Sequence, residues 1–124
     1  MWEVSGMENE DFLWAGIPFM GGIAGQSQAP CGAVSAAAIF LGLKHRCPIS
    51  DKEKEKAARN QSRAEDREYV RYFEERFGSI ICKNLLGVDF SNPEAVRQWR
   101  TSGMTRETCE KYVSYTIEWL YNQK

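Results

Sequence analysis

The apolar positions of this chain recur at helical spacing, and no segment alternates convincingly between apolar and polar residues as a half-buried strand does. The longest apolar run extends from Cys31 to Leu43, and the predicted helix that contains it, Cys31 to Lys44, is apolar on all sides, which predicts a buried helix. Lys44 ends it with a charge suited to a helix C-terminus. The pattern therefore predicts an all-α fold, one compact domain over residues 1–124 with five to six helices around a buried central helix at about 31–44.

The remaining helices are predicted from apolar spacing and from helix start and stop residues. They are Glu8 to Ala15, Ser50 to about Phe77, Ile80 to Leu86, a short helix opened by a capping box of Ser91, Pro93 and Glu94, and a last helix from Thr105. Gly78, Gly87 and Gly103 are the predicted stops. The charged stretch from Asp51 to Glu65 predicts a solvated helix face or a frayed arm. The side chains expected to face the core are Phe12, Leu13, Trp14, Tyr69, Tyr72, Phe73, Phe77, Cys82, Val96, Trp99, Cys109, Tyr112, Val113, Thr116, Ile117 and Leu120.

Composition narrows the class of protein. The chain has 124 residues, 43% of them hydrophobic, which suffices for one domain with a real core. A net charge of -1 gives no reason to expect nucleic acid or an anionic membrane as a partner. No apolar run reaches the roughly 20 residues that span a bilayer, and residues 1–16 lack the basic, hydrophobic pattern of an export signal. We expect a soluble, cytoplasmic protein, whose four cysteines serve metal ligation or transient redox chemistry rather than permanent disulfides.

The position of Cys31 is the best chemical clue. It follows the glycine-rich segment Phe19 to Gln28 and opens the central helix, where free backbone N–H groups and the helix dipole favour thiolate over thiol. Cys82 and Cys109 are predicted to point inward from later helices. We hypothesise that these three cysteines meet in one site, as redox thiols or as metal ligands.

The order of several motifs resembles the putative redox-active C_GCAxxG_C_C family. Those motifs are Phe19-Met20-Gly21-Gly22-Ile23-Ala24-Gly25, Cys31-Gly32-Ala33, Leu41-Gly42-Leu43-Lys44, Gly78-Ser79-Ile80, Cys82 before Leu85-Leu86-Gly87, and Cys109 in the last helix, so the likeness runs from about Phe12 to Leu120. It implies a cysteine-based redox site and an electron-transfer partner.

Two positions depart from the family pattern. The family's first cysteine lies upstream of the glycine-rich segment, but residues 1–30 contain none, so either the chain is short at its start or its site is altered. Ala36 stands where the pattern expects glycine, and Cys47 has no counterpart. Covalent haem is excluded, because the chain has no Cys-x-x-Cys and a single histidine, His45.

Several alternatives stay open at this point. A zinc or iron-sulfur site commonly needs four ligands, so three thiols would require a non-protein ligand, a partner subunit or Cys47. If a cofactor binds, Gly21, Gly22 and Gly32 are where it could approach the backbone. Each cysteine could instead be a small buried hydrophobe. The chain would then be a non-catalytic helical interaction module, homodimeric through Trp14, Trp119 and Tyr121.

Two further residues are assigned modest roles. About thirteen helical residues at roughly 1.5 Å each separate Cys31 from Cys47, too far for a disulfide. Cys47, beside Pro48, is predicted to be a loop thiol, and His45 a helix-terminal cation rather than a ligand or base. The glycine-rich segment lacks a phosphate-binding fingerprint.

Overall fold

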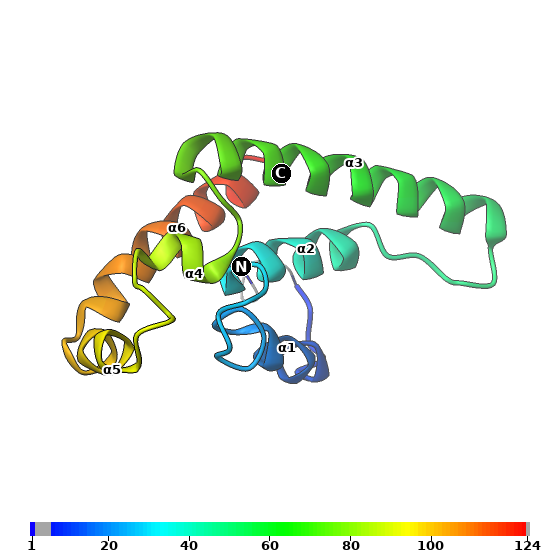
Figure 1. The fold of residues 1–124 in the computed structure, drawn as a ribbon. Helices are drawn as coiled ribbons and strands as arrows, with labels where there is room; N and C mark the ends of the chain where they lie inside the picture. Colours follow the sequence, from blue (N-terminus) through cyan, green and yellow to red (C-terminus); the bar gives the residue numbers. More distant parts are fainter. Residues whose placement is uncertain (2–5, 124) are drawn as a thin grey trace.

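A computed structural model of the chain describes residue 1 and residues 6–123 (Figure 1). Over those residues the fold is all-α, as predicted, and contains no strand. The helices of this part are α1 (Asp11–Gly16), a 3₁₀ turn η1 (Ile17–Phe19), α2 (Gly32–Lys44), α3 (Lys52–Phe77), α4 (Cys82–Leu86), α5 (Pro93–Thr101) and α6 (Met104–Asn122).

Helix α2 lies at the centre and packs against α1, α3 and α6. Figure 1 shows α3 running alongside α2 and extending past its end, with α1 on the other side of α2. Ala37 and Leu41 are fully buried, which confirms the predicted central helix. One side of α2 stays open, because Ala36 is exposed between the flanking helices α1 and α6.

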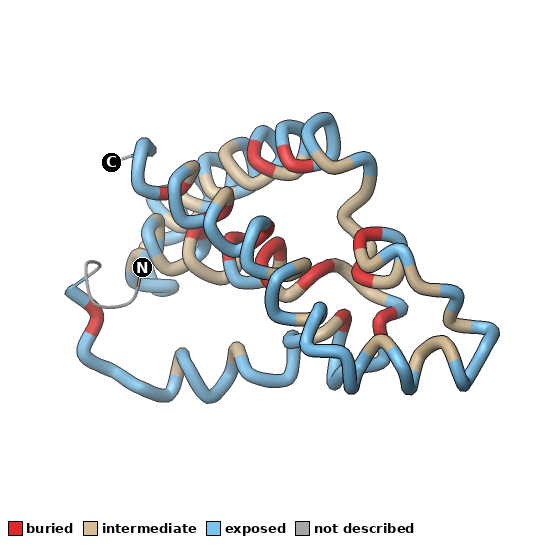
Figure 2. Tube along the Cα trace, turned by 90° about the vertical axis from the view of Figure 1, so that its left-hand side faces the viewer, coloured by how far each residue is buried: buried red, intermediate tan, exposed pale blue. Residues whose placement is uncertain are grey.

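An aromatic core joins α3 to α6. Tyr69 and Phe73 are fully buried, and the Tyr69 hydroxyl lies 2.7 Å from Thr116 Oγ1, so this buried polar group is satisfied. The Tyr112 hydroxyl donates to the Leu85 carbonyl at 2.7 Å and ties α6 to α4. In Figure 2 the buried residues of the fold are drawn in red. The predicted stripe on the second half of α3 is therefore confirmed at Tyr69 and Phe73.

Several residues expected in the core are exposed instead. Leu13 and Trp14 are 46% and 70% exposed, because α1 is a short surface helix that begins only at Asp11 and continues into η1. Tyr72 lies beside the buried face of α3 rather than on it. Val113 and Ile117 are exposed as well, since α6 is covered along one narrow face.

Helix starts lie close to the predicted residues but use different caps. Asp51, not Ser50, caps α3, because its carboxylate accepts the Lys54 amide at 3.2 Å. In place of the predicted capping box, Asn92 Oδ1 accepts the amides of residues 94 and 95 and starts α5. The helix predicted from Ile80 begins at Cys82. The three glycine stops are confirmed, with positive φ at Gly78, Gly87 and Gly103.

The charged first half of α3 is a regular helix whose side chains are mostly exposed, so it forms the solvated face predicted as one of two alternatives. None of the helices in residues 6–123 is long and apolar enough to cross a membrane.

Candidate functional site

Cys31 lies at the start of α2, as predicted, but as its N-cap residue and not within the first turn. Its backbone is extended, with φ −52° and ψ 141°, and its carbonyl accepts the Ser35 amide at 3.0 Å, the first hydrogen bond of the helix. The side chain is only 9% exposed. The thiol therefore lies in the hydrophobic core and not at the protein surface.

A short antiparallel bridge joins the segment before α2 to the segment before α4. Pro30 pairs with Ile81, and the amides of Cys31 and Cys82 each donate to a carbonyl of the opposite segment, at 2.7 and 3.0 Å. Alternate residues of paired extended segments project to the same face. The bridge therefore places Cys31 and Cys82 on one face as diagonal neighbours, although they lie far apart in the sequence.

The glycine-rich loop packs directly on Cys82, the first residue of α4. A Cβ atom on Gly22 would lie 2.8 Å from the Cys82 Cβ and 2.9 Å from the Ser27 Cα. Gly22 also has φ +68°, which side chains rarely adopt. The predicted close approach of this loop is thus an approach to a cysteine of the same chain, 5% exposed.

The same loop holds three non-glycine residues in the left-handed region. Ile23, Ala24 and Ser27 have φ values of 65°, 49° and 62°. Such conformations cost of order 1–3 kcal/mol each and persist only where surrounding contacts impose them. Here the Ala24 amide donates to the Pro18 carbonyl at 2.7 Å and the Ser27 amide to the Gly21 carbonyl at 2.9 Å. These amides already donate to backbone carbonyls of η1 and of the loop itself, and a cofactor role for Gly21, Gly22 and Gly32 stays a prediction.

Cys109 lies in the second turn of α6 and is half-buried. It shares with Cys82 a pocket of about 380 Å³ between the glycine-rich loop and helices α4, α5 and α6. Trp99, Arg100 and Thr105 line the same pocket. Of the three predicted site cysteines, Cys109 is therefore the most open to a small molecule.

The thiols of Cys31 and Cys109 have raised pKa values. Burial is the largest cause for Cys31; the amides of Ala33 and Val34 oppose it, and the nearby Cys82 thiol adds to it. The helix N-terminal amides do favour the Cys31 thiolate, as expected, but desolvation outweighs them, so the expectation of a net lowered pKa is wrong. The pKa of Cys109 is raised first by burial and then by Cys31 and Cys82. The three thiols are thus near enough to influence one another.

The described residues do not provide a ready-made metal site. All four cysteines are free thiols, and over residue 1 and residues 6–123 no group of three or more His, Cys, Asp or Glu side chains is placed to hold a metal ion. The predicted zinc or iron-sulfur ligation is not confirmed.

Comparison with known proteins identifies the family. The chain matches, over residues 1–123, the family described as "Putative redox-active protein (C_GCAxxG_C_C)". This protein belongs to the C_GCAxxG_C_C family. None of the curated proteins matches the chain, and no solved structure matches it. The family description agrees with the resemblance carried by the cysteine and glycine motifs, and it supports a redox role in general terms.

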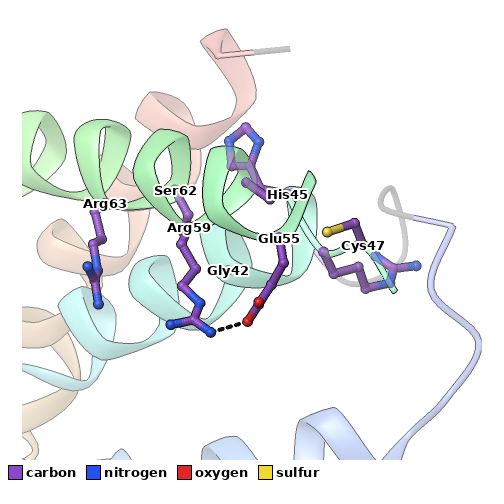
Figure 3. A pocket seen from close by; sticks show the side chains of 9 residues that line it. Gly42, His45, Cys47, Glu55, Arg59, Ser62 and Arg63 are labelled. Atoms are coloured by element: carbon purple, nitrogen blue, oxygen red, sulfur yellow. Dashed lines mark hydrogen bonds and ion pairs between the residues drawn. The ribbon is translucent and has the colours of Figure 1, made fainter. Parts of the chain in front are cut away.

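The fourth cysteine of this family member lies apart from the others, beyond the C-terminus of α2. Cys47 is a half-buried loop residue, as predicted, in a pocket of about 280 Å³ that it shares with His45, Glu55 and Arg59 (Figure 3). His45 follows the last residue of α2, and its Nε2 lies 3.0 Å from Glu65 Oε1. This confirms a helix-terminal position for His45.

Three pocket residues were missed or misassigned by sequence reasoning. Trp99 was expected in the core and lines the pocket, and Arg100 and Thr105 were not singled out. The sequence does single out Arg100 in one respect. No acidic residue stands three or four positions from it, so it lacks a partner on its own helix, whereas Arg97 pairs with Glu94.

Proposed function

We propose that this protein is a thiol-based redox protein in which Cys82 and Cys109 are the reacting pair and Cys31 is a third thiol of the same site. The observation that carries the proposal is geometric: the Pro30–Ile81 bridge places Cys31 and Cys82 on one face, and Cys82 and Cys109 line one pocket, although the three come from separate segments of the chain. The family description supports redox activity.

The exposure of the thiols suggests their order of reaction. Cys109 is half-buried and lines the open pocket, so it is the residue that an electron-transfer partner reaches first. Cys82 is 5% exposed on the same pocket and reacts with Cys109 afterwards. In the oxidation, the two sulfurs form one bond, two electrons pass to an oxidised partner disulfide, and the two thiol protons end on the partner's thiols.

Burial also sets how readily the site reacts. The pKa of Cys109 is raised, so little of it is thiolate at neutral pH, and the thiolate is the attacking species. Reaction is therefore slow in free solution and rises with pH. A reducing compartment such as the cytoplasm suits four free thiols, and we include that location in the proposal.

The experiment is a mapped oxidation. The reduced protein is treated with a small disulfide, remaining thiols are blocked, and peptides are identified by mass spectrometry. We expect a disulfide between Cys82 and Cys109, lost in Cys109→Ser and kept in the matched control Cys47→Ser. Disulfides that join Cys47 at random to other cysteines contradict the proposal.

Metal content decides between this proposal and the metal hypothesis. Protein purified without oxygen and without added metal is analysed for iron and zinc, and its visible absorption is recorded. We expect substoichiometric metal and no charge-transfer band. One metal or cluster per chain that disappears in both Cys31→Ser and Cys109→Ser would favour ligation, with the fourth ligand supplied from outside the described residues.

A second candidate function is the homodimeric interaction module. Its support is the exposed apolar surface, including Trp14 at 70% and Tyr121 at 57%; Trp119 instead packs on Tyr69 with ring centroids 5.1 Å apart. Sedimentation of wild type and Trp14→Glu measures it. A dimer broken by this substitution, together with cysteines that form no mutual disulfide, would favour the module.

A further inference from the structure

The pocket beside Cys109 and Cys82 contains one unneutralised positive charge. Arg100 is the only charged side chain among the residues that line it. Within residues 6–123, no ion pair or side-chain hydrogen bond engages this guanidinium. By contrast, Arg97, one turn earlier on α5, pairs with Glu94 at 2.7 Å. The pocket therefore presents a cation that no described side chain neutralises.

The other walls of the pocket suit a small organic molecule. Trp99 and Leu86 give it apolar surface, while Gln26 and Thr105 add polar groups. Its volume of about 380 Å³ falls within the range of roughly 300–1,000 Å³ typical of small-ligand sites. Its loop wall has the positive φ values described above, of the kind that cluster at ligand sites.

We propose that this pocket binds a small disulfide that carries a carboxylate, with the carboxylate on Arg100 and the S–S bond at Cys109. The inference rests on the proposed thiol chemistry and adds the class of substrate. A guanidinium recognises a carboxylate by two parallel hydrogen bonds, which fixes its orientation as well as its position. Arg100 is a binding residue in this scheme and takes no part in the bond changes.

The reaction proceeds in two balanced exchanges. The Cys109 thiolate attacks one substrate sulfur, the substrate S–S bond breaks, and the first substrate thiolate leaves and takes up a proton. The Cys82 thiolate then attacks the Cys109 sulfur, the mixed disulfide breaks, and the second substrate thiolate leaves and is protonated. Two electrons have passed from the protein to the substrate, which is the only oxidant needed.

Two reporter disulfides of opposite design test the inference. Dithiobis(nitrobenzoate) carries a carboxylate on each ring, and dithiodipyridine is uncharged near neutral pH; both release a coloured thiol. Their single-turnover rates are measured with Arg100→Gln and with the control Arg97→Gln, all in a Cys47→Ser background. Circular dichroism checks that each variant is folded.

We expect Arg100→Gln to slow the carboxylate probe by roughly fivefold, as for a partly solvated charge pair, and to leave the uncharged probe unchanged. Arg97→Gln should alter neither rate, and added salt should weaken the preference. Equal rates of the carboxylate probe in wild type and Arg100→Gln would overturn the inference and leave the proposed function intact. If neither probe produces the Cys82–Cys109 disulfide, the proposed function itself fails.

Discussion

The two ends of α2 carry a cysteine each, in opposite environments. At the N-terminus, Cys31 is buried and held by a backbone bridge that places Cys82 beside it. Past the C-terminus, Cys47 lies in an open pocket beside charged side chains. The comparison shows that a helix end does not by itself define a thiol's chemistry; the elements that cover it do.

The two ends also differ in how charge is treated. At the N-terminal end, burial dominates and raises the pKa of the Cys31 thiol. At the C-terminal end, burial tends to raise the pKa of Glu65, but hydrogen bonds and charges from His45 and Lys44 outweigh it and leave that pKa below its ordinary value. Lys44 Nζ lies 2.9 Å from Glu65 Oε2. The N-terminal end of α2 thus disfavours charged groups, whereas its C-terminal end holds paired charges that are partly exposed to solvent.

The largest expected contrast comes from adding one methyl group at each end. Gly22→Ala forces a side chain against Cys82 at φ +68° and should cost about 3 kcal/mol of unfolding free energy. Gly42→Ala meets open space within α2 and should stabilise by about 1 kcal/mol, the difference in helix propensity. Urea denaturation measures both. Equal effects of the two substitutions would mean that the loop does not pack on Cys82 as described.

The next contrast is in thiol reactivity. Cys31 and Cys82 are 9% and 5% exposed, so an alkylating reagent reaches them only through local opening. We expect the alkylation rate of each with iodoacetamide at neutral pH to be at least about tenfold lower than that of Cys47. Timed quenching and peptide mass spectrometry give the rate at each cysteine. If Cys31 is labelled as fast as Cys47, the two thiols are equally accessible, and the contrast between the two ends of α2 is contradicted.

A smaller effect is expected at alkaline pH. The pKa values of Cys31 and Cys109 are raised above the ordinary 9.0, mainly by burial, so the unfolded chain ionises these thiols at a pH where the folded chain keeps them protonated. Their contribution to stability is complete below that value and is lost as the pH rises toward the folded pKa. The urea concentration at the unfolding midpoint should decrease as the pH is raised from about 8 to about 10. In Cys31→Ala this decrease should be less steep than in wild type. A slope unchanged by Cys31→Ala would contradict the burial of this thiol.

The smallest effect is expected at acidic pH and belongs to the other end of α2. The pKa of Glu65 lies below its ordinary 4.5, so its contribution is present above that value and is lost as the pH falls through the folded pKa. Glu65→Gln should cost about 0.5 kcal/mol near pH 7, a modest amount because the pair is partly solvated. The difference from wild type should vanish once the pH lies below the folded pKa of Glu65. A difference that persists there would point to packing rather than charge.

Local signals predicted the framework well. Apolar spacing located α2 and the buried half of α3, and glycines at Gly78, Gly87 and Gly103 marked helix stops, because these features depend on neighbouring residues. Cap residues were less certain, since Ser50 and Asp51 are both good caps and tertiary geometry chose between them. The exposure of Trp14 was not predictable from spacing, which says which residues share a face but not whether another element covers it.

The candidate site was predicted in part. Cys31 at a helix start follows from the sequence, and so does the family membership, since both rest on the order and spacing of residues. The raised pKa of Cys31 does not follow, because it depends on how much protein surrounds the sulfur. The sequence analysis did not predict Arg100 at the site, because only the packing of α5 beside the loop places it there.

By itself, then, the sequence determined the helices, their glycine ends and the placement of one cysteine at a helix N-terminus, because backbone preferences and apolar periodicity act over a few residues. Only the tertiary structure decided which thiols are neighbours, which remain protonated and which charge faces them. Those properties follow from desolvation and from contacts between segments far apart in the chain, such as the Pro30–Ile81 bridge.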